Sequence, residues 1–281
     1  SNSNIYAIGD AAEKIDAFDG GASLVPLANI ANRQGRTVAD HIMGLEVAPS
    51  TTIGTAIVKV FDVTVAATGM NEKRAIAQGR IFRVIHTHPK SHAGYYPGAT
   101  QMALKLIVDS ASDAILGAQG VGFDGVDKRI DVIATSLKAG LRASELAELE
   151  LAYAPPYGSA KDPINMLGYI ADNLRQGLVN SIQWSEVEDR RNEGYLLIDV
   201  RTAEEFVKGS IPGARNIPVD NLREHLEGLR GEQVVVYCQV GQRGHTAARL
   251  LADEGVAVVN LDGGYATWRN SPARNQPEVL V

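Results

Sequence analysis

The spacing of apolar and polar residues divides the chain into three parts. In the first part, residues 5–10 read as a short buried strand, and residues 28–42 repeat apolar positions with helical spacing. A Pro-Ser-Thr-Thr run at 49–52 then marks a boundary. We therefore expect a first segment over residues 1–48, with a strand followed by a helix.

The second part is rich in β-type apolar runs that alternate with helical stretches. The predicted strands lie within 56–67, 80–88, 102–109 and 114–123, and the predicted helices near 71–79, 124–139 and 143–150. This order predicts a compact α+β domain over 49–160. A proline pair ends it, and a helix at 162–175 forms the core of a linker over 161–180.

The third part, residues 181–275, changes to a regular alternation of strands and helices. Apolar strands at 195–200, 233–238 and 257–261 are separated by amphipathic helical segments. Such alternation predicts an α/β domain, a parallel sheet with helices on both faces.

Composition excludes several classes of protein. The 281 residues are 45% hydrophobic and 21% charged, which is typical of a globular protein. We expect no membrane span, because no apolar run approaches the roughly 18 residues required, and no nucleic-acid partner, because the net charge is −6. The single cysteine, Cys238, cannot form an internal disulfide, so we expect a reducing, cytoplasmic location.

Cys238 carries the clearest candidate chemistry. It ends an apolar strand and is followed by a glycine-containing loop and a helix that starts near Gly244. Ligands of open α/β sheets bind at this end of the strands. Loop N–H groups, the helix N-terminus and Arg243 together favour a thiolate, which is a nucleophile and can carry a persulfide. The alternative is an inert core cysteine, which the pattern of Gly241, Arg243 and Gly244 disfavours.

Residues 181–270 resemble a rhodanese domain. The resemblance rests on IDVRTAEEF (198–206), SIPGARNIP (210–218), CQVGQRG (238–244) and LDGGYATW (261–268). It implies that Cys238 accepts a sulfane sulfur and passes it to an acceptor, with Arg243 as second catalytic residue and Asp199 and Arg201 in support. The implied persulfide cradle is Gln239, Val240, Gly241, Gln242 and Gly244. Four residues separate Cys238 from Arg243, one fewer than in related phosphatase loops, which favours sulfur over phosphate.

The first segment resembles the end of the FAD-binding domain of pyridine nucleotide-disulfide oxidoreductases. IYAIGDAAE (5–13) and LVPLANIANRQGRTVADHI (24–42) carry this resemblance, which implies that the Asp10 carboxylate bonds the flavin ribityl chain. The chain also opens without a methionine, and its four polar residues 1–4 lead straight into the apolar run 5–8. We therefore expect residues 1–48 to be the remnant of a longer FAD-binding domain.

The second part resembles the dimerisation domain of CoA-disulfide and CoA-persulfide reductases. HAGYYPGA (92–99), GAQGVGFDGVDKRID (117–131) and LAYAPPYGSAKDPINMLGY (151–169) carry this resemblance. It implies a homodimer in which tyrosines reach the partner's flavin and two polar residues lie near CoA. The implied residues are Tyr153 with Tyr95 or Tyr96 at the flavin, and Lys161 and Asn32 at the CoA.

The resemblance also implies FAD and NAD(P)H as cofactors of a full-length parent and CoA as its substrate or ligand. The FAD phosphate loop, the cysteine that faces the flavin and the NAD(P)H domain would all precede Ser1. We therefore expect no cofactor to bind tightly to this chain alone, because the FAD diphosphate has no glycine loop and helix N-terminus to rest on.

Two further patterns have simpler explanations. GVGFDG (120–125) fits the dinucleotide pattern G-x-G-x-x-G, but Asp124 would occupy the pyrophosphate position, so we expect a strand-to-helix turn. His86, His88 and His92 could suggest zinc, but no cysteine or carboxylate ligand is near them in the sequence. We expect a substrate-side loop and no metal.

The sequence predicts an α+β dimerisation domain followed by an α/β rhodanese domain. The leading hypothesis is a fragment of an FAD-dependent, NAD(P)H-linked CoA-disulfide or CoA-persulfide reductase with sulfurtransferase activity at Cys238. Its partners would be small-molecule sulfur donors and acceptors. The alternative is a dimerising sulfur carrier without turnover, and a thiosulfate:cyanide assay separates the two.

Overall fold

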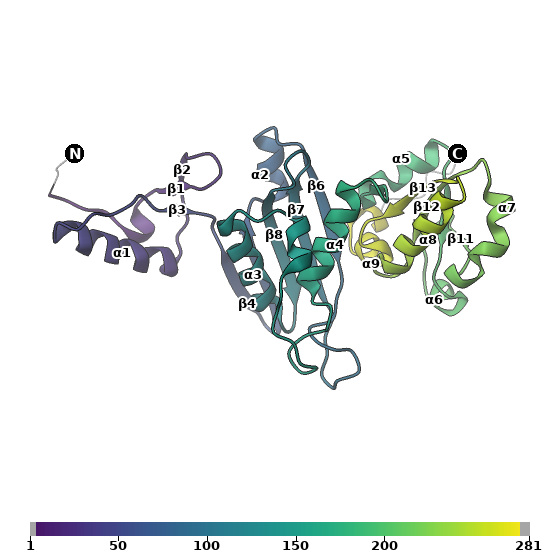
Figure 1. Ribbon diagram of the computed structural model, residues 1–281, viewed down its shortest axis with the longest axis horizontal. Coiled ribbons are helices and arrows are strands. Elements are labelled where there is room, and N and C mark those ends of the chain that lie inside the picture. The colour runs from purple at the N-terminus through teal and green to yellow at the C-terminus, as the bar shows by residue number, and fades with distance from the viewer. Residues whose placement is uncertain (1–3, 276–281) are drawn as a thin grey trace.

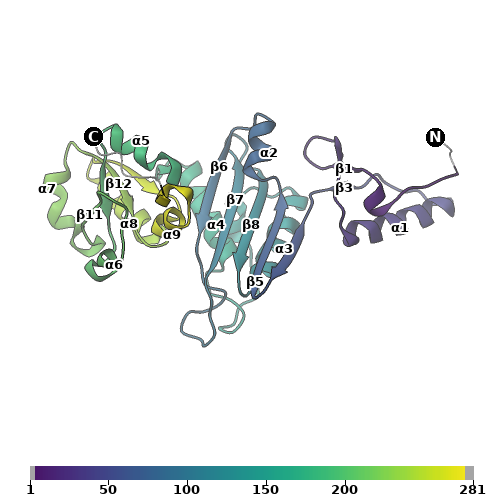
Figure 2. The same ribbon diagram turned by 180° about the vertical axis from the view of Figure 1, so that it is seen from behind.

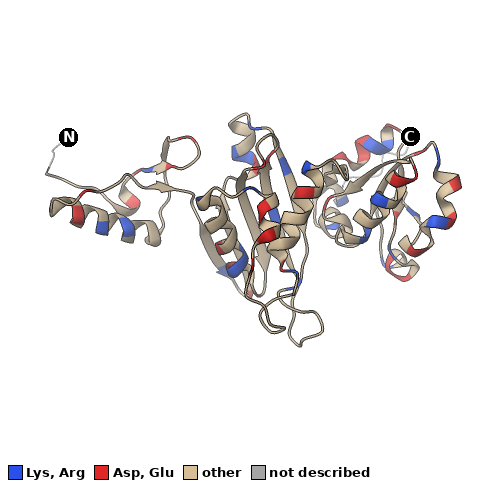
Figure 3. Cartoon of the chain, viewed as in Figure 1, with Lys and Arg blue, Asp and Glu red and all other residues tan. Residues whose placement is uncertain are grey.

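The computed structural model describes residues 4–275. Three parts follow one another along its long axis: a small N-terminal segment, a middle domain built on one sheet, and a C-terminal domain (Figure 1). Lys and Arg are interspersed with Asp and Glu on all three parts (Figure 3). Among the helices of residues 4–275, none is both long and apolar enough to cross a membrane.

The N-terminal segment contains the predicted helix, but the predicted strand at 5–10 is wrong. Residues 5–8 are extended without strand pairing, Gly9–Ala11 form a 3-10 helix, and Ile5 and Ile8 are exposed. The segment's small sheet, of order β2-β1-β3, instead uses residues further along the chain, so no neighbouring strand pairs with 5–8. The elements are β1 (Lys14–Asp16), β2 (Ala22–Ser23), α1 (Ala28–Ile42) and β3 (Thr51–Thr52).

The middle domain is a five-stranded antiparallel sheet of order β4-β5-β8-β7-β6. The predicted run 56–67 is a hairpin that turns at Phe61, a residue with a positive φ of 50°. The other strands lie within the predicted ranges. The bounds are β4 (Ala56–Val60), β5 (Val63–Gly69), α2 (Glu72–Ala77), β6 (Phe82–Thr87), β7 (Met102–Asp109), β8 (Ile115–Gly122) and α3 (Val126–Ala139).

Two helices, α3 and α4 (Pro163–Arg175), cover one face of this sheet, and the opposite face is bare (Figure 2). Ile164, Leu167 and Ala171 of α4 are fully buried in the core between helices and sheet. The predicted helix at 143–150 is a 3-10 turn, η2 (Ser144–Glu148). The Asn165 amide donates to three carbonyls in and after this turn, and so replaces the bonds of a continuing α-helix.

The C-terminal domain has the predicted parallel sheet, of order β11-β10-β12-β13-β9. Separate apolar cores lie on its two faces, as expected for helices on both sides. Its strands are β9 (Ser181–Ile182), β10 (Leu196–Asp199), β11 (Arg215–Asn216), β12 (Gln233–Tyr237) and β13 (Ala257–Leu261). Its helices are η3 (Trp184–Glu186), α5 (Val187–Asn192), α6 (Ala203–Val207), η4 (Val219–His225), α7 (Leu226–Leu229), α8 (Gln242–Asp253), α9 (Gly264–Arg269) and η5 (Pro272–Asn275).

Candidate functional site around Cys238

Cys238 lies directly after β12, the central strand of the parallel sheet, and is only 1% exposed. The backbone N–H of Gly241 donates to its Sγ at 3.2 Å. Helix α8 begins at Gln242, so its N-terminal end lies beside the same loop. A donated N–H and a helix N-terminus both stabilise negative charge on the sulfur.

The shape of the Cys238 loop depends on glycines. Gly241 has a φ of +100°, a conformation that residues with a side chain rarely adopt. Gly264 lies against the loop so closely that a Cβ there would collide with the Cys238 carbonyl oxygen. This contact lets the Tyr265 N–H donate to the Cys238 carbonyl at 2.8 Å and the Ala266 N–H donate to the Gln239 carbonyl at 2.9 Å. The start of α9 therefore fixes the loop from behind.

Arg243 is held by a carboxylate that the sequence analysis missed. Its two terminal nitrogens donate to the two oxygens of Glu205, both at 2.7 Å. The Arg243 guanidinium lowers the pKa of Glu205 to about 2, and the carboxylate in turn raises the pKa of Arg243. Glu205 also accepts a hydrogen bond from the Thr202 N–H in a capping box of α6, and the Thr-x-x-Glu spacing was a signal for this position.

Asp199 and Arg201 form a buried ion pair behind the loop, with side chains 0% and 2% exposed. Arg201 also donates to the side-chain oxygen of Gln239 at 3.0 Å, and its guanidinium lies over the Tyr265 ring at 4.2 Å. A buried pair of this kind is costly unless its remaining hydrogen-bond groups are satisfied, as they are here. The pair therefore connects β10 to the loop and to α9.

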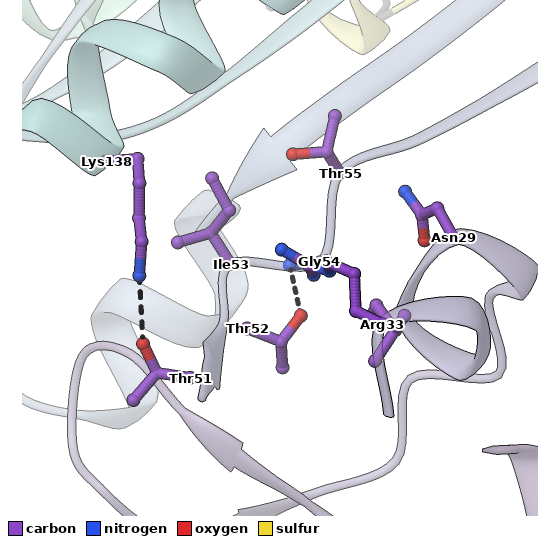
Figure 4. A pocket seen from close by; sticks show the side chains of 9 residues that line it. Asn29, Arg33, Thr51, Thr52, Ile53, Gly54, Thr55 and Lys138 are labelled. Carbon is purple, nitrogen blue, oxygen red and sulfur yellow. Dashed lines mark hydrogen bonds between the residues drawn. The ribbon is translucent and has the colours of Figure 1, made fainter. Parts of the chain in front are cut away.

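A cavity of about 310 Å³ lies at a different boundary, between the N-terminal segment and the middle domain (Figure 4). Arg33 and Asn29 of α1 approach it from one side and Lys138 of α3 from the other; Lys138 donates to Thr51 Oγ1 at 3.3 Å. None of the residues expected at flavin or CoA lines it.

A larger cavity, of about 620 Å³, lies between the middle and C-terminal domains. One wall is formed by residues 240–242 of the Cys238 loop. Another wall is formed by residues 86–89, at and just after the end of β6, together with Lys161 and α4. Lys161 lies 5.5 Å from the centre of the Tyr169 ring. Lys161, expected on the CoA side, therefore lines the same cavity as the loop expected to carry sulfur. We call this space the interdomain cavity.

The remaining candidate residues are spread over the molecule. The Tyr95 and Tyr153 hydroxyls lie 3.4 Å apart on exposed loops, and Tyr96 packs edge-on against His92. Asp10 and Asn32 are exposed in the N-terminal segment, at the opposite end of the molecule from the Cys238 loop (Figure 1). The structure therefore assembles the Cys238 loop and places the expected flavin residues apart from it.

The structure also shows where the glycine pattern at 120–125 and the histidines at 86 and 88 lie. GVGFDG (120–125) joins β8 to α3, and β8 is antiparallel to both its neighbours, whereas a dinucleotide fold needs a parallel βαβ unit. His86 and His88 point at the C-terminal domain, where His86 Nδ1 lies 2.6 Å from Asp262 and His88 Nε2 lies 2.7 Å from Thr267 Oγ1. Over residues 4–275, no group of three His, Cys, Asp or Glu side chains is placed to hold a metal ion.

Two family models match the two larger domains. Residues 55–162 match the pyridine nucleotide-disulphide oxidoreductase dimerisation domain, and residues 183–271 match the rhodanese-like domain. The Coenzyme A disulfide reductase of Staphylococcus haemolyticus is 38% identical over 172 residues, which is 61% of this chain and 39% of the relative. That of Staphylococcus aureus is 40% identical over 171 residues, 60% of this chain and 38% of the relative.

Two solved structures resemble nearly the whole chain. Reduced Bacillus anthracis CoADR-RHD is 48% identical, with a TM-score of 0.90, over 94% of this chain and 48% of that one. The NAD-dependent persulfide reductase of A. fulgidus is 39% identical, with a TM-score of 0.87, over 95% of this chain and 49% of that one. This chain thus spans less than half the length of these relatives. The chain therefore contains a pyridine nucleotide-disulphide oxidoreductase dimerisation domain followed by a rhodanese-like domain, and it is similar to the matching part of the Coenzyme A disulfide reductases.

Proposed function

We propose that this chain is a rhodanese-type sulfurtransferase that carries sulfane sulfur as a persulfide on Cys238. The supporting observation is the Cys238 loop, in which a buried thiol receives a backbone N–H at the N-terminal end of α8. A loop of this kind stabilises sulfur anions, which are both the attacking and the leaving groups of sulfur transfer.

The proposed cycle has two displacements. The Cys238 thiolate attacks the outer sulfur of a donor such as thiosulfate, the donor's S–S bond breaks, and sulfite leaves with the electron pair. An acceptor nucleophile then attacks the outer sulfur of the Cys238 persulfide and expels the Cys238 thiolate. Gln239, Val240, Gly241, Gln242 and Gly244 form the cradle around the persulfide. The Arg201–Gln239 and Arg243–Glu205 bonds hold the two sides of this cradle in place.

In a full-length parent we propose that this step works beside a reductase that acts on CoA disulfide or CoA persulfide. The names of the relatives support the substrate class, and the family supports FAD and NAD(P)H. FAD, when bound, relays electrons from NAD(P)H to a disulfide. Tyr153 with Tyr95 or Tyr96 would approach a partner's flavin, and Lys161 and Asn32 would lie on the CoA side.

The residues present fit only one end of FAD. The Asp10 carboxylate is exposed and free to accept hydrogen bonds from the ribityl hydroxyls. Within residues 4–275, the glycine-rich turn that fits a dinucleotide pattern belongs to the antiparallel sheet and does not offer a diphosphate site. We propose that flavin binding needs residues beyond this chain.

The test is sulfur transfer from thiosulfate to cyanide by the chain and by Cys238→Ser. The wild type should turn over, and the variant should lose transfer completely while its circular dichroism stays unchanged. Because Cys238 is the only cysteine, mass spectrometry after thiosulfate treatment should show one added sulfur atom on it. Persulfide formation without turnover would instead support a sulfur carrier, and transfer by the variant would exclude the proposal.

A further inference from the structure

A histidine of the middle domain and an aspartate of the rhodanese-like domain form a dyad across the domain boundary. His86 Nδ1 lies 2.6 Å from Asp262 Oδ2, and the backbone N–H of His86 donates to both oxygens of the same carboxylate at 3.0 and 3.1 Å. The two side chains are 16% and 5% exposed. Because a carboxylate only accepts hydrogen bonds, Nδ1 of a neutral His86 carries the proton, and Nε2 is the basic nitrogen.

This dyad lies beside the loop that follows Cys238. Asp262 directly precedes Gly263, and a Cβ on Gly263 would lie 2.8 Å from the His86 Cβ. Gly263 also lies near Gly241, since a Cβ added to Gly241 would lie 3.7 Å from the Gly263 nitrogen. His86, Asp262 and the loop residues 240–242 all line the interdomain cavity. In the part of the chain that is described, His86 Nε2 makes no hydrogen bond, so it is free to serve a molecule in that cavity.

We propose that His86, oriented by Asp262, is the general base that deprotonates a low-molecular-weight thiol acceptor in the interdomain cavity. The inference rests on the proposed sulfur transfer. The acceptor R–SH gives its proton to His86 Nε2, and the thiolate attacks the outer sulfur of the Cys238 persulfide. The Cys238–sulfur bond breaks, the outgoing persulfide takes the proton from His86 and leaves as R–S–SH, and Cys238 remains as the thiolate that the next loading step needs. No net oxidation occurs, because the sulfane sulfur only changes its partner.

The position of the dyad gives each domain a part in the reaction. The rhodanese-like domain holds the sulfur and supplies the orienting carboxylate, and the middle domain supplies the base. An isolated rhodanese-like domain would lack His86. A thiol with an ordinary pKa, which is mostly protonated at neutral pH, needs such a base, whereas an acidic thiol that is already a thiolate does not.

The experiment measures the two half-reactions separately in the full chain with His86→Gln. Glutamine can still donate to Asp262 but cannot accept a proton. Loading of Cys238 from thiosulfate should stay within about twofold of wild type. Discharge of the persulfide to 2-mercaptoethanol should slow by about 100-fold, the usual contribution of a general base. Discharge to 2-nitro-5-thiobenzoate, a thiolate at neutral pH, should change by less than about threefold.

His88→Gln is the matched control, because His88 bonds Thr267 across the same boundary from the residue that follows β6. It should alter discharge to both thiols by the same factor. Equal slowing of both thiols by His86→Gln would show that the dyad only holds the domains together, and unchanged discharge would also overturn the inference. Failure of the loading step in wild type would instead contradict the proposed sulfur transfer itself.

Discussion

At the scale of single residues, the Cys238 loop is held from two sides by charged pairs of different character. Asp199 and Arg201 are buried, whereas about a third of the Arg243 and Glu205 side chains is exposed. The Arg243 charge beside Cys238 is balanced by Glu205. Arg243 therefore fixes the loop to α6 through Glu205, and it is also a source of positive charge.

Glu205→Gln should remove the ion pair between Arg243 and Glu205. Because the folded-state pKa of Glu205 is lowered from 4.5 to about 2 by Arg243, the pair stabilises the fold above about pH 4.5, and this contribution is lost as the pH falls through about 2. After allowance for solvent exposure we expect a cost of about 1 kcal/mol at pH 7. Urea unfolding of wild type and variant should differ by this amount at pH 6 and converge near pH 2. A difference that is constant with pH would contradict it.

Sequence patterns were sufficient to predict the part of the site that is formed by consecutive residues. The strand, loop and helix around Cys238 lie within about 20 consecutive residues, and the periodicity and glycines of that stretch identify all three. The pairs Glu205–Arg243 and His86–Asp262 were not predicted, since they join residues 38 and 176 positions apart. Only the packing of helix on loop and of domain on domain brings them together.

At the scale of elements, the edge strand β6 of the middle sheet holds the rhodanese-like domain. The Gln183 amide donates to the Val84 carbonyl at 3.0 Å, and His86 and His88 bond Asp262 and Thr267. His86 lies in β6 and His88 directly follows it, and alternate positions of an extended segment face the same side. The H-x-H spacing that could indicate a metal site is therefore the spacing of a strand that holds a neighbouring domain.

The contact between the middle and rhodanese-like domains should become less stable in mild acid because His88 gains a proton. Burial, with a smaller effect of His86, lowers the pKa of His88 from 6.5 to about 4, so the unfolded state binds a proton that the folded state does not. Stability contributed at neutral pH is therefore lost as the pH falls from 6.5 to about 4. We expect this group to account for about 2 kcal/mol.

Tryptophan fluorescence can follow this loss, because both tryptophans of the chain, Trp184 and Trp268, lie in the rhodanese-like domain. Denaturant unfolding at pH 7 and pH 4.5 should show the loss in wild type and a smaller one in His88→Gln. The same pH dependence in both proteins would mean that His88 does not cause it.

The elements also show where apolar periodicity was misleading. Residues 102–109 and 257–261 form strands with the predicted bounds, because each pairs with a neighbouring strand on both sides. Residues 5–8 have the same apolar character, yet no strand lies beside them. A run of apolar residues predicts a tendency to be covered, and a strand requires a partner for its backbone as well.

At the scale of the whole molecule, the bare face and edge of the middle sheet are the proposed dimer surface. All of β4 is exposed, and the exposed apolar side chains Val58, Val65 and Val121 form a cross-strand row, with Val60 two residues further along β4. Monomeric proteins rarely leave a contiguous apolar patch of this kind uncovered. The match to a dimerisation domain supports a symmetric pair of chains.

Val58→Asp should therefore convert a dimer into a monomer without unfolding it, because this side chain is 54% exposed in the single chain. Sedimentation velocity at tens of micromolar would measure the change, with an expected loss of affinity of at least about 100-fold from a buried unpaired charge. The matched control is Val207→Asp on α6, where the valine is 84% exposed and lies outside this surface. A dimer that survives Val58→Asp would place the interface elsewhere.

The burial of α4 has a consequence for how the molecule can be divided. This helix was expected to be a linker, yet its apolar side chains complete the core of the middle sheet. The linker between the two domains is the short, mostly exposed stretch 176–180. A protease that cleaves exposed backbone should thus cut after the helix. Gene fusions that exchange the rhodanese-like domain should be joined there as well, since a junction before residue 163 would remove α4 from the core of the middle domain.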